Sequence, residues 1–126
     1  MNNYTEALRV YNDLLKYQDD NYEIYYNIAV IYTTLNQYTK AEEYYRKTIR
    51  LNSNLHEAYF GLGQLYLINK NLEQAEKCLF KSANKDELYA KSYYCLAKLY
   101  ALKCEEGKVV SCLKLAIDND KKFVDK

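Results

Sequence analysis

The sequence lacks proline and tryptophan altogether, and only three of its 126 residues are glycine. Because proline and glycine punctuate turns and helix ends, their scarcity disfavours a turn-rich β fold and favours long helices. Long apolar runs are also missing: nothing approaches the roughly 18 residues that a membrane span needs, and the first residues hold no leader-like apolar core. We therefore expect a helical, cytoplasmic protein with no membrane partner.

Side chains that carry metal or catalytic chemistry are scarce as well. There is one histidine, and no two of the four cysteines show the CxxC spacing that is typical of zinc and redox sites. Neither a glycine-rich phosphate loop nor a GxSxG turn occurs. The sequence thus predicts no enzyme, no metal site and no cofactor. It also predicts reduced cysteines that pack as small apolar side chains, at Cys78, Cys95, Cys104 and Cys112.

Charge is nearly balanced, with a formal net charge of +1, which argues against nucleic acid as a partner. The sixteen tyrosines are of a residue type that stacks on single-stranded bases. Six of them, however, recur where the repeat described next needs aromatic side chains for its core. RNA binding is therefore the least favoured of the functions considered.

A 34-residue period runs through the chain. Residues 2–11 (NNYTEALRVY) and 36–45 (NQYTKAEEYY) share five of ten positions, and rows 22–55, 56–89 and 90–123 align without insertions. The first half of each row shares an aromatic, an aliphatic, a small and a second aromatic residue: Tyr25, Ile28, Ala29 and Tyr32; Tyr59, Leu62, Gly63 and Tyr66; Tyr93, Leu96, Ala97 and Tyr100. The second halves share three further positions: Ala41, Tyr45 and Thr48; Ala75, Leu79 and Ser82; Val109, Leu113 and Ala116.

These positions recur at the three- and four-residue spacings of amphipathic helices, so each row predicts a helix–turn–helix. Small residues facing each other let the two helices approach closely. We expect helices at about 22–35, 38–51, 56–69, 72–84, 90–103 and 106–118, with amino-terminal caps at Asn3, Asp20, Asn54 and Asn71. Residues 3–17 match the second half of a row. They predict a half repeat, and we expect the chain to be an excerpt of a longer array.

This pattern resembles the tetratricopeptide repeat (TPR) family, whose 34-residue unit has the same order of aromatic, aliphatic, small and aromatic residues. Two departures are Val109 in place of a small residue and Cys104 where the turn usually has glycine. The resemblance covers the whole chain and implies one domain over 1–126, with a half repeat at 3–17 and repeats at 22–55, 56–89 and 90–123. The implied fold is all-α, a right-handed superhelical solenoid of antiparallel helix pairs with about seven helices, and the implied function is protein binding.

The first helix of each row has a second face, about 160° from the core stripe at 100° per residue. An aromatic residue lies on it in every row, with amides nearby that suit an extended backbone. Glutamates at one end and lysines at the other predict a polarised groove for a peptide or partner segment. Its predicted residues are Glu23, Tyr26, Asn27, Val30, Glu57, Phe60, Gly61, Gln64, Lys91, Tyr94 and Lys98.

The alternative function is a structural scaffold, in which helix ends or the convex face mediate oligomerisation without a dedicated peptide ligand. Self-association through exposed repeat ends would fit that role. One specialised partner is disfavoured: family members that bind acidic chaperone tails use a clamp of lysine, arginine and asparagine. The matching positions here include Tyr26, Val30, Gly61 and Cys95.

Overall fold

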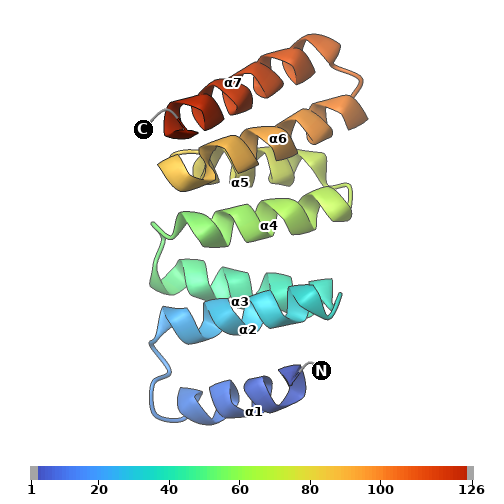
Figure 1. Cartoon of the computed structure of the whole chain (residues 1–126). Coiled ribbons are helices and arrows are strands. Elements are labelled where there is room, and N and C mark those ends of the chain that lie inside the picture. Colours follow the sequence, from blue (N-terminus) through green and yellow to red (C-terminus); the bar gives the residue numbers. More distant parts are fainter. Residues whose placement is uncertain (1–2, 125–126) are drawn as a thin grey trace. The chain divides into compact units, whose positions relative to one another are not determined.

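The computed structural model describes residues 3–124, without the side chains of residues 86 and 120–124. In this part of the chain every regular element is a helix, and Figure 1 shows the seven of them in sequence order. They are α1 (Tyr4–Leu15), α2 (Tyr22–Thr34), α3 (Tyr38–Leu51), α4 (His56–Ile68), α5 (Leu72–Ser82), α6 (Asp86–Leu102) and α7 (Glu106–Val124).

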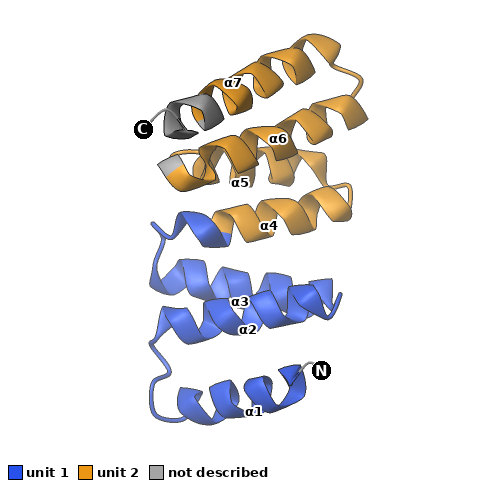
Figure 2. Ribbon diagram, in the orientation of Figure 1, with its two compact units in different colours: residues 1–58 blue, residues 59–126 orange. Residues whose placement is uncertain are grey.

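Residue contacts divide the chain into two compact units, residues 1–58 and 59–126 (Figure 2). The first unit contains α1, α2, α3 and the first turn of α4, and the second contains the rest of α4 with α5, α6 and α7. Within the first unit α2 packs against α1 and α3, and within the second α6 packs against α5 and α7. Each unit therefore has a central helix with neighbours on two sides.

The turns inside the helix pairs repeat the same backbone geometry at the 34-residue period. Asn36, Lys70 and Cys104 all have positive φ, at 61°, 61° and 59°. At each site the next residue donates its backbone N–H to the carbonyl five residues back, as Asn71 does to Tyr66 at 2.8 Å. This is the Schellman arrangement, which satisfies the last carbonyls of a helix and places one residue in the left-handed region.

The core of the first unit lies between α2 and α3, where small residues meet. Ala29 and Ala41 are fully buried, as the period predicts, and the Tyr45 ring fills the space beside them. Thr48 is also fully buried, and its hydroxyl donates to the Tyr44 carbonyl at 2.8 Å. A hydroxyl satisfied inside its own helix can be buried without an unpaired polar atom.

In the second unit α4 and α5 approach closely at a glycine. A Cβ built on Gly63 would lie 2.8 Å from two side-chain atoms of Leu79, which is fully buried. Between α5 and α6 the buried hydroxyls of Ser82 and Ser92 are 2.6 Å apart. Ser82 also donates to the Leu79 carbonyl at 2.8 Å. Because a hydroxyl has only one proton to donate, Ser92 is the donor in the hydrogen bond between the two serines.

A polar contact also ties α5 to α6. The Tyr100 hydroxyl donates to the Glu76 carboxylate, and Lys103 lies 4.0 Å from the same carboxylate. Burial, and next the hydrogen bond to Glu76, raise the pKa of Tyr100 because both favour the neutral phenol. The aromatic residue that the period assigns to the core therefore also pairs the two helices through its polar end.

Several boundaries differ from the sequence prediction. α6 begins at Asp86, four residues before the predicted start, because Leu88 is buried on the same side as Ser92 and adds a turn. α7 continues to Val124 rather than ending near 118. Leu113, predicted in the core, is 37% exposed, whereas Cys112 beside it is buried.

The predicted helix caps have the right position at α1 and α5 and the wrong position at α2. Asn21, not Asp20, caps α2, and its side chain accepts from the Glu23 N–H at 3.0 Å. Asn3 and Asn71 sit at the cap positions of α1 and α5 but make no side-chain cap hydrogen bond. Asn54 donates its backbone N–H to the Asn52 side chain in the preceding turn. Cap residue types alone therefore did not predict where the hydrogen bonds form.

Candidate peptide-binding surfaces

The first helix of each repeat is buried along two sides, which the period predicted only in part. Besides the expected stripe, the positions of Ile24 and Ile31 are buried in all three rows. The equivalent buried residues are Ala58 and Leu65 in α4, and Ser92 and Leu99 in α6. Burial on two sides leaves one narrow strip of each helix facing solvent, and that strip contains most of the predicted groove residues.

The exposed strip of α2 lies in the first unit and carries both polar and apolar side chains. Glu23 and Val30 are exposed, while Tyr26 and Asn27 are half-buried. The Tyr26 ring meets the core Tyr45 edge-on, with the ring centroids 6.0 Å apart. Tyr26 therefore contributes to the α2–α3 packing as well as to the surface. Glu57, at the start of α4, is half-buried in the same unit.

In the second unit the strip on α4 places Phe60, half-buried, next to exposed Gln64 and Ile68. Gly61, which was predicted to line the groove, is buried. Ile68 is 52% exposed although it ends a helix that is otherwise well covered. The α4 strip is therefore apolar at both ends with one amide between them.

The α6 strip is the most exposed and the most basic of the three. It runs through Lys91, Tyr94, Lys98 and Leu102 at three- and four-residue spacings, with Tyr94 39% and Leu102 53% exposed. Neither lysine forms an ion pair with a side chain that the structure describes. An aromatic and an aliphatic side chain thus lie beside two ammonium groups available to an acidic partner.

Cys95 lies next to this strip but is buried, and its chemistry follows from that position. Burial raises the pKa of the Cys95 thiol, and the nearby Lys98 lowers it by a smaller amount. The group is therefore a neutral thiol near neutral pH. All four cysteines are free, Cys95 and Cys112 buried, Cys78 half-buried and Cys104 exposed. The prediction of small buried apolar residues is right for Cys95 and Cys112 and wrong for Cys104.

Sequence reasoning missed a hollow of about 270 Å³ in the first unit, between the amino-terminal part of α2 and the end of α3. The Tyr25 hydroxyl donates to the Asp19 carbonyl at 2.9 Å, and Lys47 lies 4.8 Å from the centre of the Tyr44 ring. The sequence holds no signal for this hollow, because its lining residues come from different segments of the chain. The lining residues are Asp19, Tyr25, Lys47, Arg50 and Leu51.

Models of known protein families match part of the repeat array. A tetratricopeptide repeat model matches residues 22–55, and a second tetratricopeptide repeat model matches residues 44–77. Residues 22–77 therefore contain tetratricopeptide repeats. No match is found among curated proteins.

Several solved structures share the fold over most of the chain. MamA superposes with a TM-score of 0.86 at 24% identity, covering 97% of this chain and 71% of that one. BtubC from P. vanneervenii gives 0.84 at 17%, covering 98% and 59%. YrrB, described as a TPR protein with an unusual peptide-binding site, gives 0.76 at 18%, covering 88% and 57%. These likenesses confirm the predicted all-α fold of antiparallel helix pairs.

In the described part of the chain no helix is long and apolar enough to cross a membrane. No three histidine, cysteine, aspartate or glutamate side chains of the described residues gather where they could hold a metal ion. The fold and the family support a protein-interaction module in general terms.

Proposed function

We propose that this TPR chain binds an extended peptide or partner segment, and that the exposed strip of α6 is its contact surface. The observation that carries the proposal is the α6 strip, where Tyr94 and Leu102 stay exposed on a helix buried along its other sides. Exposed apolar side chains on a rigid helix provide contact area at little entropic cost. A cytoplasmic location stays a prediction from the sequence, and the proposed role requires no catalysis by this chain.

Charge indicates which peptides would bind. Lys91 and Lys98 flank Tyr94 and favour an acidic peptide with an apolar side chain. Glu23 and Glu57, in the first unit, would instead favour basic side chains. Peptide binding by YrrB supports this reading as an analogy of fold. The scaffold role remains the second candidate, and the exposed faces of α1 and α7 favour it.

The lysines make a sharper test than the aromatic residues, because Tyr26 also packs on Tyr45. Peptides selected from a phage-displayed random library should be rich in acidic and apolar residues. Lys91→Glu with Lys98→Glu should weaken their binding at least about tenfold, as fluorescence anisotropy would measure, since each lost charge pair and its replacement by repulsion costs up to about 1 kcal/mol.

A matched variant controls for net charge. Lys77→Glu with Lys114→Glu makes the same change in total charge at exposed positions on α5 and α7. This variant should bind the selected peptides as well as the parent chain does. Equal weakening by both variants, or a library that yields no binding peptide, would show that the α6 strip is not the site.

A further inference from the structure

The exposed side of α1 has the composition of an interface. Although α1 repeats five of ten residues of the α3 segment, it buries none of its side chains, whereas α3 buries Ala41, Tyr45 and Thr48. Val10 is 44% and Leu14 37% exposed, one turn apart, and Tyr17 follows at 85% in the turn after the helix. These three residues, which we name the α1 apolar strip, are all partly exposed, and Tyr17 is almost fully so.

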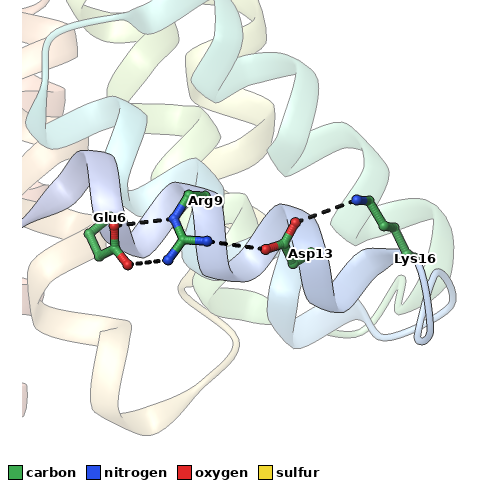
Figure 3. A network of polar contacts seen from close by, with 4 residues as sticks. All are labelled: Glu6, Arg9, Asp13 and Lys16. Atoms are coloured by element: carbon green, nitrogen blue, oxygen red, sulfur yellow. Dashed lines mark hydrogen bonds and ion pairs between the residues drawn. The ribbon is translucent and has the colours of Figure 1, made fainter.

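A ladder of alternating charges flanks the strip along the same helix (Figure 3). Arg9 pairs with Glu6 and lies 3.5 Å from Asp13, and Asp13 lies 3.6 Å from Lys16. Read along the helix, the order is acid, base, acid, base. All four side chains are more than half exposed, so they stay accessible to a second molecule.

This order is self-complementary in one orientation only. When the helix is reversed the order becomes base, acid, base, acid, so an antiparallel copy sets Glu6 opposite Lys16 and Arg9 opposite Asp13. The same two-fold relation sets Val10 opposite Leu14, within the roughly 3 Å that a two-residue offset along the helix adds. In a parallel two-fold pair the two ladders would lie on opposite sides of the contact and would not meet.

We propose that α1 is a self-association surface, on which two copies of the chain pair through antiparallel α1 helices. The apolar strip supplies the contact, the charge ladder selects the orientation, and the two-fold axis makes the interface isologous. The net charge of +1 leaves little repulsion between copies. One helix from each copy makes a small interface, so we expect a dissociation constant on the order of 100 µM.

Sedimentation equilibrium of the full chain, from about 5 to about 500 µM at low ionic strength, tests the pairing itself. The weight-average mass should rise from monomer towards dimer and go no higher, because an isologous interface closes. Val10→Ser with Leu14→Ser should weaken the association at least about tenfold. Val110→Ser with Leu113→Ser, at similarly exposed residues of α7, should leave it unchanged.

An inverted ladder tests the orientation. A variant with Glu6→Lys, Arg9→Glu, Asp13→Lys and Lys16→Glu keeps opposite charges at the same spacings within the helix. It should still self-associate, but it should not pair with the wild type, because antiparallel helices would then meet like with like. Fluorescently labelled wild-type chain, sedimented at tracer concentration with an excess of unlabelled wild type or variant, measures both.

Each result decides the question. Association of the wild type that is lost on changing the α1 strip, retained on changing α7 and absent between wild type and inverted variant supports the antiparallel pair. A monomer at every concentration, an equal effect of the α7 variant, or preferred pairing of wild type with the inverted variant overturns it. Circular dichroism of each variant at about 10 µM checks that α1 remains helical.

Discussion

At the scale of single residues, Gly63 shows how one position sets the distance between two helices. Glycine inside a helix costs about 1 kcal/mol relative to alanine, so Gly63→Ala would stabilise an isolated α4. Here the added Cβ would lie 2.8 Å from the Leu79 side chain, and overpacking costs about 1–3 kcal/mol. We expect a net loss of about 1 kcal/mol or more in the free energy of unfolding, measured by urea denaturation.

Gly107 is the control for this change. It lies in the first turn of α7, and a Cβ built there meets nothing within 4 Å. Gly107→Ala should therefore raise the free energy of unfolding by about 0.5 kcal/mol through backbone entropy alone. If both substitutions stabilise the chain, α4 and α5 are not held as closely as Gly63 and Leu79 indicate.

The buried Ser82–Ser92 pair gives a second prediction at this scale. Ser92→Ala removes a donor and leaves Ser82 its bond to the Leu79 carbonyl, so the loss should be about 1 kcal/mol. Ser82→Ala leaves the Ser92 hydroxyl without its acceptor and should cost more. Thermal unfolding monitored by circular dichroism would order the two variants.

The double variant tests the coupling between these hydroxyls. Replacing both by alanine removes the hydrogen bond without leaving either group unpaired, so its cost should be smaller than the sum of the single losses. Additive losses would mean that the two hydroxyls do not bond one another. An opposite order of the single variants would mean that the proton is shared in the other direction.

At the scale of elements, the turns within the helix pairs share one geometry with different residues. Asn36, Lys70 and Cys104 each adopt a left-handed conformation, which costs a residue with a Cβ roughly 1 kcal/mol and asparagine less. Lys70→Gly and Cys104→Gly should each raise the free energy of unfolding by about 0.5–1 kcal/mol, as denaturant titration would show.

Asn36→Gly is the internal comparison for these turns. Asparagine tolerates the left-handed region through local hydrogen bonding, so this substitution should change stability by only a few tenths of a kcal/mol. Equal gains at all three turns, or a loss at Lys70, would show that the side chains at these positions make contacts that outweigh the backbone conformation.

The period predicted the elements well, because each repeat buries the same faces with the same residue classes. Helices α2, α3 and α4 match their predicted ranges within one residue at each end. The start of α6 was wrong, since an extra buried Leu88 extends the helix and periodicity alone cannot weigh a local stripe against the repeat. The cap of α2 was predicted one residue too early, and Asn3 and Asn71 make no side-chain cap hydrogen bond, because several polar residues flank each helix and compete for the same N–H groups.

At the scale of the whole molecule, the sequence predicted the exposed helix faces better than it predicted the function of those faces. The strip on α6 follows from the period, because a helix packed on two sides leaves one side exposed. The hollow beside Tyr25 did not, since Asp19, Lys47 and Arg50 come from segments whose meeting depends on packing angles. A regular period predicts which residues lie on each face of a helix, whereas a cavity depends on how the ends of neighbouring helices pack against one another.

The same scale gives a prediction about uneven stability along the chain. Residues 2–11, which include the start of α1, and residues 36–45, which include the start of α3, share five of ten positions. Without protection by structure, the amides of these two segments should therefore exchange at similar rates. In the folded chain α1 has no buried side chain, while α3 has three. Local opening of α1 should therefore cost far less, and at micromolar concentration its amides should exchange about a hundredfold faster or more, as hydrogen–deuterium exchange mass spectrometry would show.

Concentration then separates two causes of protection in α1. If packing on α2 alone holds the helix, the exchange rates of its amides should not depend on protein concentration. If two copies pair through α1, its amides should slow as the chain approaches about 500 µM while those of α3 keep their rates, because mass action stabilises only the helix at the interface. Equal protection of α1 and α3 at micromolar concentration would contradict the expected hundredfold difference in exchange rate. A helix with no buried side chain would then be held as firmly as one that forms the core.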